Sequence, residues 1–254
     1  MIEHRDADLT GSRFRNVDLS GTRIHSAFLR GVVITNAWIE DVRIEGHVQS
    51  MTVNGVDVTG YVEAELDRRH PERKGLRPHD AAGLRRAWAE SIARAEATVA
   101  GARRLPANLL DERVNGEFSF IQTLRHLVFA FDRWLTGPVF GDPEPYFHPF
   151  GQTHDGALEG PAQGLDPDAC PTLDEVLAVR GEQQQRMTDR LRTTTDADLH
   201  RTTASPNGGE TTVLECVHVV LNEEWWHHQY AARDLAILLE SGGLDGVALP
   251  AGPP

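Results

Sequence analysis

Large apolar residues recur at every fifth position near the start of the chain. An α-helix returns side chains to one face every 3.6 residues and a strand every two, so neither produces a period of five. A square coil does, because each group of five residues forms one side. The pattern predicts two coils over residues 6–46, with these side chains inside: Leu9, Phe14, Leu19, Ile24, Leu29, Ile34, Ile39 and Ile44. Small or β-branched residues two positions earlier would fill the space beside them: Ala7, Ser12, Val17, Thr22, Ala27, Val32, Ala37 and Val42.

Further along the chain, the apolar spacing changes to three and four residues, which indicates amphipathic helices. Four long helices are expected at about 79–105, 118–137, 172–193 and 212–241. Capping-box pairs mark the start of the last two, Thr172 with Glu175 and Thr212 with Glu215. The stretch 138–171 is rich in Pro and Gly, which predicts one long crossover in a four-helix bundle.

The predicted fold class is α+β and multidomain, a short right-handed quadrilateral β-helix followed by a four-helix bundle. The β-helix domain is expected over residues 1–60, with 48–62 as a last irregular strand or cap. A helix and linker follow at 61–78, then the bundle at 79–241 and a disordered tail at 242–254.

Composition narrows the classes of function. The net charge is −13, and the first 48 residues are almost neutral, so the body is acidic. This balance argues against nucleic-acid binding. No apolar run is long enough to span a membrane, and the N-terminus lacks the pattern of a signal peptide, so a cytoplasmic location is expected. Cys170 and Cys216 form no metal or redox motif.

Three polar residues interrupt apolar helix surfaces and are candidate metal ligands. The apolar stripe of the last helix is broken at Glu224 and His228, one turn apart, and His126 interrupts the most apolar helix. Together, two imidazoles and a carboxylate would suit Zn²⁺, Ni²⁺ or Fe²⁺. Glu223 and His227 form a competing pair at the same spacing, with His227 expected beside the site. The alternative is a buried Glu–His pair without metal, with His126 bonded to a backbone carbonyl or a buried water.

Two family resemblances rest on these patterns. Residues 7–11 (ADLTG) and 17–21 (VDLSG) resemble the pentapeptide-repeat family. The runs 123–127 (TLRHL) and 223–228 (EEWWHH) resemble the DinB-like superfamily of mycothiol-dependent transferases and maleylpyruvate isomerase-like proteins. That resemblance implies a four-helix bundle whose metal is held by a histidine on the second helix and an i, i+4 pair on the fourth. The glutamate departs from the commonest set, since many members have histidine there.

The resemblance implies a metal-dependent thiol S-transferase. Under this hypothesis His126, Glu224 and His228 hold the metal, a low-molecular-weight thiol such as mycothiol attacks a small-molecule electrophile, and His227 or His154 moves protons. The alternative is a non-catalytic scaffold whose repeat mediates protein recognition or dimerisation. A homodimer is expected, partly because adjacent Trp225 and Trp226 are not expected to face one core.

Overall fold

The computed structural model describes residues 4, 7–24, 27–46, 48–142, 146–153 and 164–241. The chain divides into two compact units, one made of residues 8–74 and the other of residues 1–7 and 75–254. The expected tail at 242–254 lies outside the described residues.

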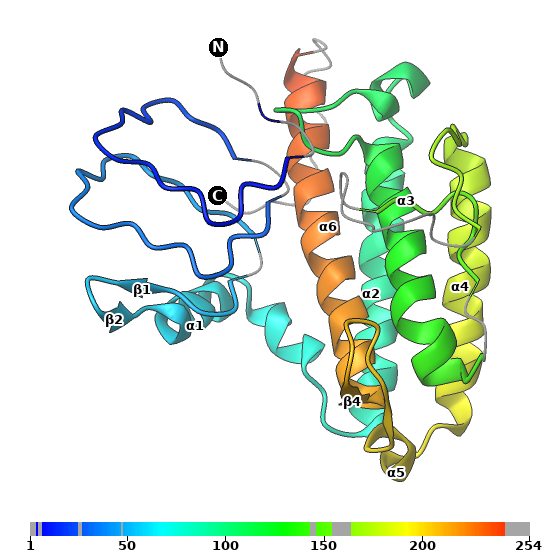
Figure 1. Ribbon diagram of the computed structural model, residues 1–254. Helices are drawn as coiled ribbons and strands as arrows, with labels where there is room; N and C mark the ends of the chain where they lie inside the picture. Colours follow the sequence, from blue (N-terminus) through cyan, green and yellow to red (C-terminus); the bar gives the residue numbers. More distant parts are fainter. Residues whose placement is uncertain are drawn as a thin grey trace. The chain divides into compact units, whose positions relative to one another are not determined.

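The repeat segment turns at intervals of five residues. Its backbone takes a positive φ at these corners: Gly11, Asn16, Gly21, Gly31, Asn36, Asp41 and Gly46. Glycine, asparagine and aspartate are the residues that adopt this conformation most readily. Next to two corners, Asp8 and Asp18 accept hydrogen bonds from the backbone N–H groups of Thr10 and Ser20. The five-residue period of the sequence is therefore present in the backbone, which winds in wide loops (Figure 1).

The side chains expected inside these coils are exposed. Their exposed fractions run from 46% for Leu9 to 71% for Ile34. The described part of residues 7–50 contains no strand, and its backbone hydrogen bonds are turns such as Ser12 N–H to Leu9 O. The expected apolar interior is thus wrong for this structure, and a β-helix is not confirmed.

A hairpin and a helix complete this unit. Strands β1 (Thr52–Val53) and β2 (Val56–Asp57) pair antiparallel. They are joined by Asn54-Gly55, both at positive φ, the usual chemistry of a two-residue hairpin turn. Helix α1 (Thr59–Arg69) and the 3-10 helix η1 (Pro71–Leu76) follow, where a helix and a linker were expected.

The second unit is a four-helix bundle (Figure 1). Its long helices are α2 (Ala81–Ala102), α3 (Phe120–Phe131), α4 (Leu173–Thr193) and α6 (Val213–Ser241). Helices α2 and α3 each pack against both α4 and α6, so α2 lies diagonally across from α3. Shorter elements connect them: η2 (Ala107–Asp111), α5 (Asp196–Leu199) and the hairpin of β3 (Thr202–Ala204) and β4 (Glu210–Thr212). This unit is helical with little sheet, as the sequence predicted.

Helix α3 does not end at Gly137 as expected. It continues as a π-helix, η3 (Asp132–Phe140), which contains Pro138 and ends before Gly141 at a φ of 80°. The expected capping boxes of α4 and α6 are formed, with Thr172 Oγ1 and Thr212 Oγ1 accepting from the backbone N–H groups of Glu175 and Glu215. In both, the glutamate side chain accepts in return from the threonine N–H.

Both adjacent tryptophans belong to one core. Trp225 is completely buried among residues such as Trp88 and Leu221, and Trp226 is half-buried against the same cluster. Their rings meet edge to face, with centroids 4.7 Å apart. The expectation that they cannot share a core is therefore wrong. Among the described residues, no helix has the length and apolar character that a membrane span requires.

Candidate metal centre

The run 223–228 places two glutamate–histidine pairs on α6. Glu223 with His227 and Glu224 with His228 each span four residues, so the members of a pair lie on one face. Neighbouring residues of an α-helix point about 100° apart. The two pairs therefore face different surroundings, and these surroundings decide which pair can meet His126.

The pair that meets His126 is Glu223 with His227. Glu223 Oε2 lies 3.5 Å from His126 Nε2 and 3.1 Å from His227 Nε2. The two imidazole rings have centroids 4.6 Å apart. Helix α3 supplies His126 and α6 supplies the other two, and these helices are direct neighbours. One carboxylate oxygen thus stands between two imidazole nitrogens.

A backbone carbonyl orients His126. Its Nδ1 lies 3.0 Å from the carbonyl oxygen of Gln152. A carbonyl only accepts hydrogen bonds, so Nδ1 carries a proton in this contact, and Nε2 is the ring nitrogen that faces Glu223. Burial lowers the pKa of His126, which favours the neutral imidazole that a metal requires.

Glu223 is held as a carboxylate. Burial alone would raise the pKa of Glu223, but its contacts with His126 and His227 outweigh burial and lower that pKa. The Glu223 side chain is 28% exposed, against 3% for His126 and 12% for His227. The cluster therefore has a buried side toward α3 and a side open to solvent.

The expected partners Glu224 and His228 lie elsewhere. Glu224 Oε1 accepts a hydrogen bond from Arg180 on α4, and Glu224 Oε2 lies 3.4 Å from His228 Nε2. The structure thus corrects the expected set of His126, Glu224 and His228, because these three are not brought together. Glu224 and His228 are each 2% exposed, as their place on the apolar stripe predicted. The counter-charge of buried Glu224 is an arginine.

The residues present fit a divalent metal. Within the described ranges, one group of three ligand-type side chains has its ligand atoms within 4.8 Å of one another: His126, Glu223 and His227. Two ligands at about 2.1 Å from one ion lie roughly 3.0–3.5 Å apart. The two nitrogen–oxygen distances, 3.5 and 3.1 Å, match that spacing. Gln152, whose carbonyl orients His126, also has a buried Oε1 without a hydrogen-bond partner.

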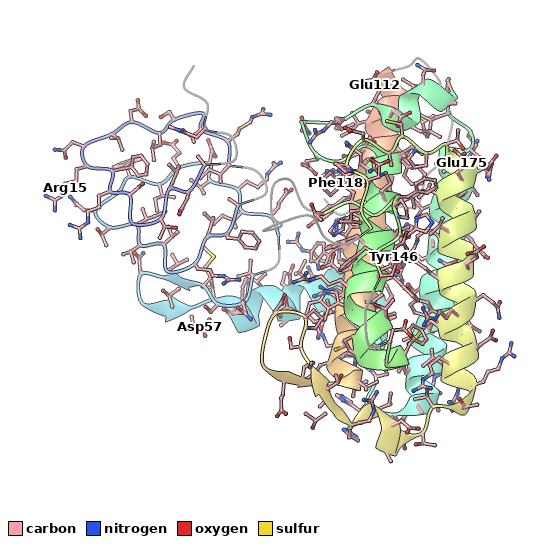
Figure 2. The ribbon with its side chains drawn as sticks, turned by 45° about the vertical axis from the view of Figure 1, so that its right-hand side comes forward. Arg15, Asp57, Glu112, Phe118, Tyr146 and Glu175 are labelled. Carbon is pink, nitrogen blue, oxygen red and sulfur yellow. The ribbon has the colours of Figure 1, made fainter. Side chains whose placement is uncertain are left out.

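Aromatic side chains surround this cluster. The rings of Phe118 and Phe129 have centroids 5.7 and 6.1 Å from that of His126. Phe147 stacks on Phe129 at 5.3 Å, and Tyr230 meets His227 edge to face at 6.1 Å. Figure 2 labels Phe118, which precedes α3, and Tyr146, in the segment that returns after η3. The wall beside the ligands is therefore apolar.

The segment 146–153 is tied to α3 and to the start of η3 by several hydrogen bonds. Arg125 Nε donates to Phe150 O at 2.9 Å, and Gln152 N–H donates to Arg125 O at 3.1 Å. Asp132 accepts from the backbone N–H of His148 at 2.8 Å. These contacts fix the carbonyl that orients His126.

His148 and His218 lie apart from the cluster. His148 accepts at Nδ1 from the Phe150 N–H, and His218 bonds Pro78 O through Nε2. His154 lies outside the described residues. Cys170 is exposed, and burial raises the pKa of Cys216 to about 11.

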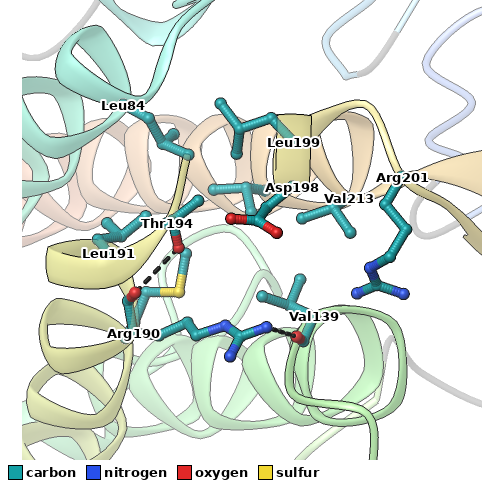
Figure 3. A pocket seen from close by; sticks show the side chains of 11 residues that line it. Leu84, Val139, Arg190, Leu191, Thr194, Asp198, Leu199, Arg201 and Val213 are labelled. Atoms are coloured by element: carbon teal, nitrogen blue, oxygen red, sulfur yellow. Dashed lines mark hydrogen bonds between the residues drawn. The ribbon is translucent and has the colours of Figure 1, made fainter. Parts of the chain in front are cut away.

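A small pocket lies near the end of α4 (Figure 3). It has a volume of about 10 Å³, which is room for about one water. Across it, Arg190 donates to the Val139 carbonyl, and Thr194 Oγ1 donates to the Arg190 carbonyl. Its size excludes it as a substrate site.

Comparison with known proteins assigns both units. A family model of pentapeptide repeats, with eight copies, matches residues 5–36. Searches of curated proteins and of solved structures gave no match. The family model of the DinB superfamily matches residues 84–231, more than half of the chain, and this span includes His126, Glu223 and His227. The chain belongs to the DinB superfamily and carries a pentapeptide-repeat region at its N-terminus.

Proposed function

We propose that the bundle binds one divalent metal, Zn²⁺, Ni²⁺ or Fe²⁺, through His126, Glu223 and His227 and acts as a thiol-dependent S-transferase. The convergence of these three side chains carries the proposal. Two nitrogens and one carboxylate are a ligand set that these ions accept while positions stay open. Membership of the DinB superfamily, whose members commonly bind a metal, supports it.

The bound ion would supply a Lewis acid that lowers the pKa of a low-molecular-weight thiol such as mycothiol. The other roles in the proposed reaction belong to residues of the chain. Glu223 keeps one side of the centre open to solvent, so a thiol can approach there. Phe118 and Phe129 form an apolar wall on which a small electrophile can lie. His227, expected to transfer protons beside the site, would instead be a metal ligand.

Metal analysis of the purified protein tests the first half of this proposal. About one equivalent of metal is expected in the wild type, and none in His126→Ala. A matched control is His218→Ala, which removes a half-buried histidine of α6 that bonds Pro78 instead. Absence of metal together with no rise in melting temperature on adding Zn²⁺ or Ni²⁺ would contradict the proposal.

An activity assay tests the second half. The metal-loaded protein should consume an electrophile such as a chlorinated nitrobenzene only when mycothiol is present, and the His126→Ala variant should not. Metal binding without thiol-dependent turnover would leave the metal centre standing and remove the transferase.

A second candidate function, as an interaction module, follows from the repeat segment. Its large apolar residues are exposed, including Trp38 at 93% and Ile34 at 71%. Apolar surface of this kind is typical of association sites. We infer self-association into a homodimer through these side chains. Light scattering should give twice the monomer mass for the wild type and the monomer mass for Ile34→Glu. A wild-type monomer at micromolar concentration would contradict this function.

A further inference from the structure

A second polar cluster lies inside the bundle, away from the metal centre. It consists of Arg180, Glu224 and His228, whose side chains are 3%, 3% and 1% exposed. Arg180 reaches across from α4 to Glu224 on α6, and its Nη1 donates to the Leu127 carbonyl on α3. Arg180 and Glu224 therefore form a buried ion pair at the centre of the four helices.

His228 is left without hydrogen bonds. Both of its ring nitrogens are buried and have no hydrogen-bond partner. Glu224 Oε2 is likewise buried and has no hydrogen-bond partner. The imidazole lies beside this carboxylate, but 3.4 Å separates His228 Nε2 from Glu224 Oε2. Buried polar groups in native proteins nearly always have hydrogen-bond partners. An exception therefore points to a partner from outside the protein chain.

A cavity lies where this partner would be. It has a volume of about 210 Å³ and is lined by all four long helices. Arg180 and His228 are its buried polar residues, and its apolar part comes from Ala95, Val99, Leu124 and Leu177. The lining also includes the exposed Glu96 and the partly exposed Gln184, so the cavity can be reached from solvent. None of His126, Glu223 and His227 lines it.

The size and lining of the cavity define the ligand. Apolar cavities of roughly 150 Å³ already accept benzene, so a single aromatic ring fits here. Arg180 and Glu224 balance each other, and Glu96 adds a negative charge among the lining residues. A buried anion would find no free counter-charge, whereas a hydroxyl group could bond His228.

We propose that this cavity is a binding site for a small neutral molecule with an apolar body and one hydroxyl group, of which phenol is the simplest aromatic example. The hydroxyl bonds His228, and the ring lies against Ala95, Val99 and Leu124. The site is separate from the metal centre and goes beyond the proposed transferase, because it uses the pair Glu224 and His228 rather than the pair Glu223 and His227.

Calorimetric titration of the full chain with phenol, benzoate and benzene tests this site. Phenol should bind saturably at one site, and benzoate and benzene about tenfold or more weakly, since one lacks a counter-charge and the other a hydroxyl. Ala95→Leu fills the cavity and should abolish phenol binding. His228→Leu should weaken it about tenfold. Benzoate binding as tightly as phenol would overturn the ligand assignment.

Two controls keep the result independent of folding and of the metal centre. The Ala95→Leu variant should melt within a few degrees of the wild type and keep its response to Zn²⁺. His227→Ala should lose that response and still bind phenol with unchanged affinity. Phenol binding that Ala95→Leu leaves intact, or no saturable binding to the wild type, would overturn the site itself.

Discussion

His126 and Gln152 are joined by a hydrogen bond from the imidazole Nδ1 to the backbone carbonyl, 3.0 Å long. This bond directs Nε2 toward Glu223 and His227, and it depends on the position of segment 146–153. Partners of this kind typically change metal affinity 10–100-fold when they are lost.

Substitution of Arg125 should weaken metal binding without removing a ligand. Arg125 Nε holds Phe150 O, so Arg125→Met frees the segment that carries the Gln152 carbonyl. We expect Zn²⁺ affinity to fall about tenfold, measured by competition with a chromophoric chelator. Arg133→Met is the matched control, because Arg133 also holds a carbonyl, that of Pro206, but in another loop. Equal affinities for the two variants would show that the loop does not position His126.

Stability of the metal-free protein should fall as the pH is lowered from 7 to 5. Burial lowers the pKa of His126 from 6.5, so the unfolded chain binds this proton first. The stabilisation is complete above pH 6.5 and is lost as the pH falls toward the folded pKa. His218 acts in the same direction, because its pKa is also lowered, chiefly by burial.

The contribution of His126 to this pH dependence can be isolated with two variants. Urea midpoints measured with chelator present should drop less over this range in His126→Asn than in the wild type. The exposed His200 provides the control, since His200→Asn should follow the wild type. A parallel drop in His126→Asn would contradict a buried neutral imidazole.

Breaking the buried ion pair of Arg180 and Glu224 should destabilise the folded protein. Glu224→Gln leaves Arg180 charged and unpaired in the core, a change that typically costs 3–5 kcal/mol. The double variant Arg180→Met/Glu224→Gln should be more stable than Glu224→Gln alone, since no unpaired charge remains. The exposed pair Arg186–Asp142 is the reference, and Arg186→Met should change the free energy of unfolding by less than about 1 kcal/mol. Urea denaturation measures all three, and equal small effects would rule out a buried ion pair.

The repeat segment offers a direct test of burial. Ile24 is 67% exposed, so at a concentration at which the chain is monomeric Ile24→Asp should change the free energy of unfolding by no more than about 0.5 kcal/mol. Inside a closed β-helix, the same carboxylate would cost several kcal/mol. Thermal melts of the full chain distinguish the two, and a large loss of stability would restore the β-helix with Ile24 inside.

The sequence predicted the bundle well because its signals are local. Capping boxes such as Thr172 with Glu175 and apolar positions three and four residues apart fix helices without reference to distant parts. The apolar stripe also correctly identified Glu224 and His228 as buried. Burial did not reveal the partner of Glu224, since Arg180 lies 44 positions away and is charged. The one available signal was this arginine in the middle of α4, which can neutralise a buried glutamate.

The pair Glu223 and His227, which meets His126, was harder to predict because it lies beside the apolar stripe. Glu223 remains 28% exposed, so the apolar pattern does not mark it as a buried position. The predicted burial of the repeat's large apolar side chains was wrong for another reason. A period of five fixes the corners of the backbone, but it does not fix whether two coils close over their side chains. The five-residue corners at Gly11, Gly21 and Gly31 were predictable, and the exposure of Ile24 was not.

The register of the doubled motif is the central claim, and paired histidine variants test it. Zn²⁺ at about 100 times its Kd should stabilise the wild type by about 2.7 kcal/mol, a rise of roughly 5–10 °C in melting temperature. His227→Ala should abolish this rise, because His227 Nε2 shares Glu223 Oε2 with His126. His228→Ala should melt lower without metal but keep most of the rise. The opposite outcome, with the rise lost in His228→Ala and kept in His227→Ala, would contradict the metal centre assigned here.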